Sequence, residues 1–223
     1  MGRPAVAVLA AGLGTRFGGG KLEAPCAGKP LGRWAVEAVE AAGLGPGTIV
    51  TGPEWVSFAG GWTRAVNPAA EAGLGSSLAL AARLARGKGA LLIVLADMPL
   101  VTADYLRELA ARPAPAATRY PEGHAGVPAL LDRRMIEKAA RLSGDRGAGP
   151  LLGRARLLDP PPGMLRDVDT ADDLAEVERM LTANRPPPPA SRTPPRKRGR
   201  TGAVNPRPFL RGRCRAQRGG GGQ

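Results

Sequence analysis

The chain has few of the residues on which several common kinds of active site depend. Its 223 residues include one histidine, His124, and two cysteines, Cys26 and Cys214. A serine-type triad or a histidine-rich zinc site is hard to build with one histidine, and two distant cysteines form neither a disulfide framework nor a metal-type spacing. His124 lies in a polar turn, where a surface position is the favoured interpretation. These shortages favour chemistry based on charge.

Long hydrophobic runs are also missing from the sequence. No stretch approaches the roughly 18 apolar residues that a membrane span requires. The apolar run near the N-terminus is at the short end for a signal-peptide core, and it leads directly into a glycine-rich segment. We therefore expect a cytoplasmic protein that has no membrane partner.

Acidic residues are absent from the last part of the chain. Of the 32 lysines and arginines, 11 lie at or after Arg185, which leaves 21 basic against 19 acidic residues in the preceding part. Like charge with few apolar residues predicts a disordered basic tail rich in Pro, Arg and Gly over 185–223, after a single domain over 1–184. A solvated extension is the favoured interpretation of the tail. Weak non-specific binding to nucleic acid or to an acidic partner is the alternative.

Strand and helix patterns alternate along residues 1–184. This alternation predicts an α/β fold with three layers, an α/β/α Rossmann-like sandwich around a mostly parallel sheet. Ligands of such sheets bind at the carboxyl ends of the strands. The expected strands are Ala5–Leu9, Thr48–Thr51, Arg64–Asn67 and Ala90–Ala96. The expected helices are Pro30–Ala42, Gly75–Ala85, one from Thr102 to Ala111, one opened by Asp132, and a last one from a capping box at Thr170 and Asp173 to about Thr182.

The segment from Leu9 to Lys21 is the most informative part of the sequence. It follows a buried strand, and five of the eleven residues after Leu9 are glycines, which let backbone amides approach an anion closely. Arg16 and Lys21 add two full positive charges. This pattern predicts a loop that holds the phosphates of a nucleoside triphosphate.

Two better-known phosphate loops do not fit this segment. The dinucleotide fingerprint would need a glycine where Phe17 stands, and the P-loop would need a glycine at Thr15 and a hydroxyl at Leu22. A mobile glycine turn with incidental cations is the structural alternative.

The segment resembles the signature of the MobA-like nucleotidyltransferases, L-A-A-G-x-x-x-R-[MF]-G-x-x-K. Four further blocks resemble that family in the family's order, and together the blocks spread from Leu9 to Leu174. These blocks are Asn67-Pro68 with Gly73 to Leu78, Leu95 to Leu100, Gly126-Val127-Pro128 leading to Gly144-Asp145-Arg146-Gly147-Ala148, and Asp167 to Leu174. The resemblance implies a nucleotidyltransferase fold and the transfer of a nucleotide from a triphosphate to a phosphorylated acceptor, with pyrophosphate leaving.

The resemblance also implies roles for single residues. Lys21 would stabilise the α-phosphate in the transition state, and Arg16 would hold the leaving pyrophosphate. Asn67 and the turn Gly75-Ser76-Ser77 would grip base and ribose; a turn with a helix N-cap at Ser76 is the alternative. The implied nucleotide-binding residues are Leu9, Ala10, Ala11, Gly12, Gly14, Lys21, Asn67, Ser76 and Asp97.

Two carboxylates are the expected ligands of a Mg²⁺ ion. Asp97 ends the most apolar strand, where a carboxylate needs a cation partner, and hard oxygen ligands suit Mg²⁺. Its alternative role is to cap the turn through Pro99. Asp167 and Asp169 flank Val168, so both face the same side of an extended segment. The resemblance favours Asp169 as the second ligand.

The substrate is less specified than the reaction. Ala10-Ala11-Gly12 resembles the molybdenum cofactor cytidylyltransferases, and we hypothesise that the Ala11 methyl narrows the base pocket and favours CTP over GTP. Val127 and Gly149 stand where the family often has histidine and arginine. The resemblance implies molybdopterin cofactor as the acceptor, and these two departures leave a guanylyltransferase or a sugar-phosphate nucleotidylyltransferase as alternatives. Two alternative functions fall outside the enzymes. The chain could be a nucleic-acid-binding protein that acts through the tail, or a module that binds nucleotide without catalysis.

Overall fold

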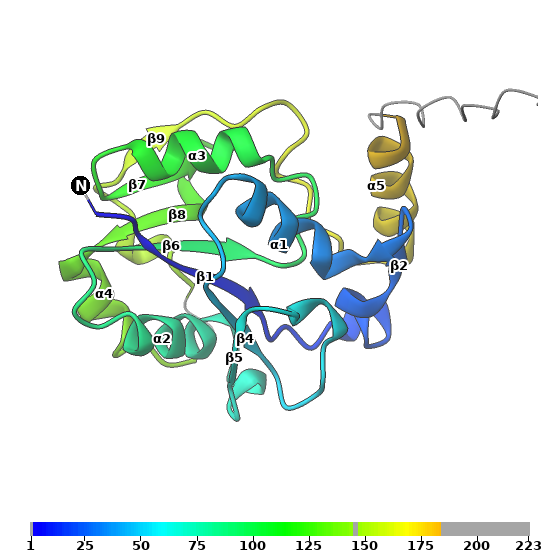
Figure 1. The fold of residues 1–223 in the computed structure, drawn as a ribbon, viewed down its shortest axis with the longest axis horizontal. Helices are drawn as coiled ribbons and strands as arrows, with labels where there is room; N and C mark the ends of the chain where they lie inside the picture. Colours follow the sequence, from blue (N-terminus) through cyan, green and yellow to red (C-terminus); the bar gives the residue numbers. More distant parts are fainter. Residues whose placement is uncertain (1, 145–146, 184–223) are drawn as a thin grey trace, which may run out of the picture. The chain divides into compact units, whose positions relative to one another are not determined.

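The computed structural model describes residues 2–144 and 147–183, and its centre is a seven-stranded sheet (Figure 1). The strand order is β5-β4-β1-β6-β8-β7-β9. All neighbouring strands run parallel except β8, which is antiparallel to β6 and β7. The expected α/β fold with a mostly parallel sheet is confirmed. The strands are β1 (Ala5–Ala10), β4 (Thr48–Thr51), β5 (Thr63–Val66), β6 (Ala90–Leu95), β7 (Ala116–Arg119), β8 (Ala125–Asp132) and β9 (Arg156–Leu158).

Helices cover both faces of the sheet, which gives the three expected layers. Helices α1 (Leu31–Ala41) and α3 (Ala103–Ala111) lie on one face, and α2 (Leu74–Leu84) and α4 (Arg133–Ala139) lie on the other (Figure 1).

Two hydrophobic cores follow from the alternation of side chains along the central strands. Val6 and Val8 of β1 pack with α1 and α3, whereas Ala7 and Leu9 pack with α2 and α4. Successive side chains of a strand point to opposite faces, so a strand buried on both sides must be apolar throughout. This explains why the aliphatic runs of β1 and β6 were recognisable in the sequence.

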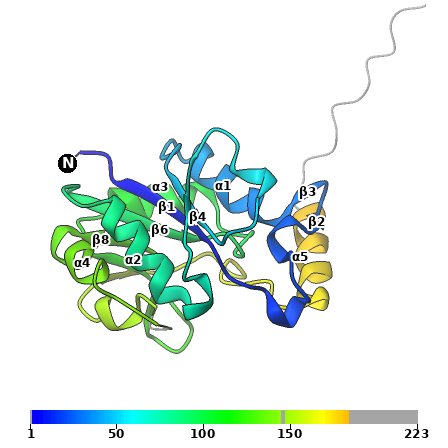
Figure 2. The same ribbon diagram turned by 90° about the horizontal axis from the view of Figure 1, so that it is seen from below.

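The last helix lies beside a small hairpin at one end of the sheet (Figure 2). Helix α5 (Ala171–Ala183) packs against β2 (Pro25–Cys26), which pairs with β3 (Lys29–Pro30). The amide of Ala27 donates to the carboxylate of Glu178 at 2.7 Å. The hairpin, which follows the glycine-rich segment from Leu9 to Lys21, is thereby attached to the last helix.

The helix ends follow the predicted caps with one exception. The Thr102 hydroxyl accepts from the amide of Tyr105, and the Asp132 carboxylate accepts from that of Met135. Thr170 and Asp173 form the reciprocal capping box. Ser76 is not an N-cap, because α2 begins one residue earlier than expected, after Gly73. Short 3₁₀ turns occupy Thr15–Phe17, Lys21–Glu23, Ser57–Ala59, Ala70–Ala72 and Gly149–Leu151.

None of the helices in the described residues is both long enough and apolar enough to cross a membrane. The predicted disordered tail over 185–223 lies outside the described residues, as do Asp145 and Arg146 of the fourth sequence block. The domain division therefore stays a prediction.

Candidate active site

The glycine-rich segment and Asp97 leave the sheet side by side. Strands β1 and β6 are parallel neighbours in which Leu9 pairs with Leu95. The amide of Ala96 donates to the carbonyl of Leu9 at 2.9 Å, so the two chains stay in register to the end of the sheet. Both exits lie at the carboxyl edge, where ligands of parallel sheets bind. The candidate active site is at this edge.

Lys21 joins the site to two carboxylates that are distant in sequence. Its ammonium nitrogen Nζ donates to Oδ2 of Asp97 at 2.9 Å and to Oδ1 of Asp169 at 3.2 Å. The Lys21 side chain is only 7% exposed, whereas those of Asp97 and Asp169 are 27% and 47% exposed. The buried ammonium therefore has its two partners on the side of the site that is open to solvent.

The electrostatics of this cluster favour a charged lysine. Burial of the ammonium by itself lowers the pKa of Lys21, but the negative charge of Asp97 and hydrogen bonds to Asp97 and Asp169 outweigh it. The pKa of Lys21 is consequently raised above its usual value. Lys21 stays protonated over the whole physiological range and acts as a fixed positive charge.

Backbone contacts bring Asp169 into the site. The amide of Val168 donates to the carbonyl of Asp97 at 3.1 Å, and Val168 itself is fully buried. The amide of Asp169 donates to Asp173, a member of the capping box of α5. The segment before α5 is thus fixed between the end of β6 and a helix N-terminus, with Asp169 directed at Lys21.

Asp167 lies close to the same charges without contacting Lys21 directly. Partial burial raises the pKa of Asp167, and the negative charges of Asp97 and Asp169 raise it further. The hydrogen bond from its own amide and the Lys21 charge oppose this increase only in part. Three carboxylates therefore share a site in which Lys21 is the buried cation.

Arg16 lies at the rim of the site. Its guanidinium nitrogen Nη1 is 3.3 Å from Oδ2 of Asp169, and 79% of its side chain is exposed. Such an exposed pair contributes little to stability, and the long side chain can exchange its partner at small cost. Arg16 and Lys21 thus bind the same carboxylate from the exposed and the buried side.

Gly14 and Gly12 serve the loop in different ways. Gly14 has a φ of 58°, in the left-handed region, and a Cβ added there would lie 3.1 Å from Cβ of Lys21. A Cβ added at Gly12 would meet nothing within 4 Å. Gly14 therefore permits the turn that places Lys21, while Gly12 leaves space open for a ligand.

Two cavities flank the loop at Ala11 and Gly12. One of about 340 Å³ reaches Asp97, and one of about 330 Å³ reaches Lys21. Among the predicted nucleotide-binding residues, Leu9, Ala11, Gly12, Gly14 and Asp97 line the first, and Ala10, Ala11, Gly12 and Lys21 line the second. Leu74 and Ser77, from the sequence block Gly73 to Leu78, also line the first cavity. The sequence did not single out Ala70 and Glu71 of the first cavity or Gly52 to Val56 of the second.

Asn67 and Ser76 lie behind the first cavity and do not line it. Asn67 is buried, and its amide nitrogen donates to the hydroxyls of Ser76 and Ser77 at 2.8 and 2.9 Å. Its carbonyl oxygen accepts from the amide of Ala69. Asn67 therefore organises the turn before α2, and Ser77 rather than Ser76 faces the cavity. A direct contact of Asn67 or Ser76 with nucleotide remains a prediction.

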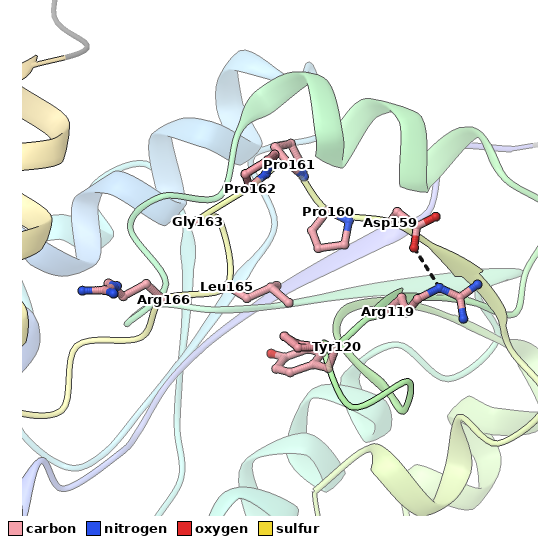
Figure 3. Close-up of a pocket in the computed structure, with 10 residues that line it drawn as sticks. Arg119, Tyr120, Asp159, Pro160, Pro161, Pro162, Gly163, Leu165 and Arg166 are labelled. Carbon is pink, nitrogen blue, oxygen red and sulfur yellow. Dashed lines mark hydrogen bonds and ion pairs between the residues drawn. The ribbon is translucent and has the colours of Figure 1, made fainter.

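A cavity of about 510 Å³ lies next to the segment that leads to Asp167 (Figure 3). Tyr120, Pro160 and Leu165 give it apolar walls (Figure 3). Burial, followed by the negative charges of Asp167 and Asp97, raises the pKa of Tyr120 to about 12, and Leu165 and Arg166 of the same cavity lead directly to Asp167. The remaining lining residues are Arg119, Pro121, Asp159, Pro161, Pro162, Gly163 and Arg166.

His124 is a surface residue, as expected. Its side chain is 61% exposed and stacks on Tyr120 with ring centroids 5.1 Å apart. Its nitrogen Nδ1 lies 3.6 Å from Glu122. His124 lies in the hairpin between β7 and β8 and lines a cavity of about 260 Å³ together with Leu9 and Leu95.

The donor set of the site fits a divalent cation that is shared with phosphate. Within the described ranges, no three or more His, Cys, Asp or Glu side chains converge as a complete protein metal site. Asp97 and Asp169, however, already hold one cation, the Lys21 ammonium, between them. Mg²⁺ commonly takes one or two carboxylates together with substrate phosphates, and two such carboxylates are present.

Comparison with known proteins decides the family. Residues 6–159, more than half of the chain, match the MobA-like NTP transferase domain. The chain belongs to the MobA-like NTP transferase family. As a member of this family it is a nucleotidyltransferase, and its substrate is a nucleoside triphosphate.

This MobA-like protein is similar to known proteins in sequence and in fold. Purine catabolism protein PucB of Bacillus subtilis is 29% identical over 195 residues, which cover 78% of this chain and 95% of PucB. A nucleotidyl transferase from Methanothermobacter superposes with a TM-score of 0.71 at 22% identity, covering 83% of this chain and all of that one. The manganese complex of Rv0371c from Mycobacterium tuberculosis gives 0.65 at 25% identity, covering 80% and 99%.

Proposed function

We propose that this nucleotidyltransferase transfers CMP from CTP to the phosphate of molybdopterin cofactor in a Mg²⁺-dependent reaction that releases pyrophosphate. The observation that carries the proposal is the position of the Lys21 ammonium between the carboxylates of Asp97 and Asp169. The Lys21 ammonium, which can bind phosphate, thereby lies next to two carboxylates that can bind a metal, at the end of the glycine-rich loop. The cytoplasmic location stays a prediction of the sequence.

The reaction exchanges one phosphorus–oxygen bond for another. An oxygen of the acceptor phosphate forms a bond to the α-phosphorus, and the bond to the bridging oxygen breaks, so that pyrophosphate leaves with the electron pair. The protein mainly orients the two reactants and stabilises the developing negative charge. In this proposal Lys21 acts on the α-phosphate, and the exposed Arg16 holds the leaving pyrophosphate.

Asp97 and Asp169 are the proposed ligands of Mg²⁺, in agreement with the manganese that the relative Rv0371c binds. The bound metal supplies further positive charge to the phosphate chain. Asp167 is the carboxylate of the cluster that does not contact Lys21. Burial raises the pKa of Asp167 first, and the negative charges of Asp97 and Asp169 raise it further; a metal would balance that charge.

Ala11 supports the choice of CTP. It is 6% exposed and lines both cavities beside the loop, so its methyl group takes up space where the nucleoside would lie. We infer that this methyl group favours the smaller base. Asn67 and Ser76 would contribute indirectly, by holding the turn that forms the wall of the first cavity.

The cavity of Figure 3 is the proposed acceptor site, because its lining residues Leu165 and Arg166 lead directly to Asp167 of the carboxylate cluster. Its two arginines are already paired. Arg119 donates to Asp159 at 2.8 Å, as Figure 3 shows, and Arg166 forms an ion pair with Glu176. Little unpaired positive charge is left for a large anion, and this favours a sugar phosphate as the second candidate acceptor.

A pyrophosphate-release assay tests the proposal. The protein with Mg²⁺ is offered each of the four triphosphates together with molybdopterin cofactor or a panel of sugar phosphates. We expect release with CTP and molybdopterin cofactor, and a loss on the order of 100- to 1000-fold in kcat for Lys21→Ala, the usual effect of removing one electrostatic stabiliser.

The same assay separates the alternatives. Faster turnover of GTP would contradict the role of Ala11 and would indicate a guanylyltransferase. Pyrophosphate release only with a sugar phosphate would show that the acceptor is a sugar phosphate and not molybdopterin cofactor. No release with any pair, or equal release by Lys21→Ala, would contradict the proposed mechanism. Lys88→Ala is a matched control, since Lys88 lies outside both loop cavities.

A further inference from the structure

Trp55 is the most exposed of the three tryptophans. Its surface is 74% exposed, whereas Trp62 is buried and Trp34 is half-buried. The indole N–H groups of the other two are used inside the protein, Trp34 to the carbonyl of Cys26 and Trp62 to Glu40. An aromatic side chain of this size gains stability from burial, so its exposure calls for a role at the surface.

The loop that carries Trp55 is held by an arginine from the neighbouring strand. Arg64 of β5 donates through Nη2 to the carbonyls of Gly52, Pro53 and Glu54 at 3.3, 3.1 and 2.6 Å. The same guanidinium lies 5.5 Å from the centre of the Trp55 ring. One cation thus fixes three successive peptide groups and supports the indole from one side.

A second connection ties this loop to the turn of Lys21. Glu23, in the same 3₁₀ turn as Lys21, accepts from both the amide and the hydroxyl of Ser57 at 2.6 Å. Val56, between Trp55 and Ser57, is buried in the core. The exposed indole therefore belongs to a segment that is held at both ends. One of these ends is bonded to the 3₁₀ turn that contains Lys21.

Trp55 and Lys21 line one cavity. The cavity of about 330 Å³ is lined by Glu54 and Trp55 from the loop after β4 and by Ala11, Gly12 and Lys21 from the glycine-rich segment. A ligand that fills it would have a planar, uncharged part near the indole and a negatively charged part near the ammonium. The nucleoside triphosphate has this construction, with a heteroaromatic base joined through ribose to the phosphates.

We propose that Trp55 is a stacking platform for the nucleobase. This inference rests on the proposed function for the identity of the ligand. The cavity of Figure 3, which we assign to the acceptor, shares no lining residue with the Trp55 cavity, so the observations favour the base over a ring of the acceptor. Every base has an aromatic face; Trp55 therefore adds affinity for all nucleotides, while Ala11 acts on their size.

Equilibrium binding of CTP and of inorganic tripolyphosphate tests the platform. We expect Trp55→Ala to weaken CTP binding roughly 10- to 100-fold, the range for loss of one aromatic–base stack, and to leave tripolyphosphate binding unchanged. Trp55→Phe keeps a ring and should recover most of the affinity. In the unmodified protein, CTP should quench tryptophan fluorescence, and tripolyphosphate should not.

The outcomes show whether Trp55 stacks on the nucleobase or on a ring of the acceptor. Equal CTP affinity in Trp55→Ala and the unmodified protein overturns the proposal, and so does a lack of CTP binding by the unmodified protein. A higher KM for the acceptor at unchanged CTP affinity would assign the indole to the acceptor instead. Trp55-dependent CTP binding without pyrophosphate release would contradict the proposed function and leave the platform standing. Unchanged melting temperatures of the variants exclude misfolding.

Discussion

Lys21 and Asp97 form an ion pair of 2.9 Å although 76 positions separate them in the chain. The contact joins the loop after β1 to the end of β6, and Asp169 adds a second carboxylate from just before α5. A nearly buried ammonium without such partners would lose its hydration without compensation. The fold itself therefore supplies the carboxylate partners of Lys21 at the sheet edge.

Gly12 and Gly14 should respond differently to substitution. Gly14→Ala places a Cβ at a left-handed φ and 3.1 Å from Cβ of Lys21, so it should lower stability by about 1–2 kcal/mol and reduce kcat. Gly12→Val projects into the open space between the two cavities, so it should raise the KM for the triphosphate with little change in stability. Thermal denaturation and steady-state kinetics measure both effects. Equal changes in stability, kcat and KM for the two variants would contradict the separate roles of Gly14 in the turn and Gly12 in ligand binding.

Asp167 should make stability depend on pH. Its pKa is raised in the folded protein, which therefore binds the proton more tightly than the unfolded chain does. The stabilisation by this proton is complete below the ordinary aspartate pKa, and it is lost as the pH rises through the raised pKa. Asp167→Asn should consequently gain stability relative to the parent between acidic and neutral pH.

Denaturant unfolding of both proteins across that pH interval checks this prediction. The expected gain is small because Asp167 is an exposed residue. Asp132→Asn is a useful comparison, since Asp132 caps α4 through a hydrogen bond to Met135 and lies away from the cluster. A stability difference between parent and Asp167→Asn that does not change with pH would contradict the raised pKa of Asp167.

Removal of residues 185–223 separates the enzyme from a nucleic-acid-binding protein. The tail has 11 basic and no acidic residues, so any binding of nucleic acid through it should weaken steeply with salt. We expect the shortened protein to keep its turnover and to lose such binding. A large fall in turnover would assign the tail a part in catalysis, against the domain division that the sequence predicts.

The elements that could be predicted are those with a local cause. The strands β1 and β6 are apolar throughout because both of their faces are covered, and Thr102 and Asp132 lie where side chains cap helices. The five sequence blocks marked the loop, Asp97 and Asp169 before any geometry was known. The pairing of these residues with one lysine confirms that they share a site, although it does not test their catalytic roles.

The features that were missed depend on contacts across the fold. Strand β8 is antiparallel to β6, and its sequence carries no sign of that direction, which is set by the hairpin with β7. The hydrogen bonds of the Asn67 amide to two serines of the adjoining turn could not be predicted from the sequence, and its contact with nucleotide stays a prediction. Trp55 had no interpretation, because its exposure and its support by Arg64 exist only in the folded chain.

Binding of Mn²⁺, followed by electron paramagnetic resonance, tests the central claim most directly. Mn²⁺ takes the place of Mg²⁺, and a CTP analogue that cannot be cleaved keeps the site loaded. We predict that Asp97→Asn and Asp169→Asn each weaken Mn²⁺ binding in the presence of the analogue, while Asp132→Asn does not. Unchanged Mn²⁺ affinity in both active-site variants would contradict the claim that these two carboxylates hold the metal and the triphosphate together.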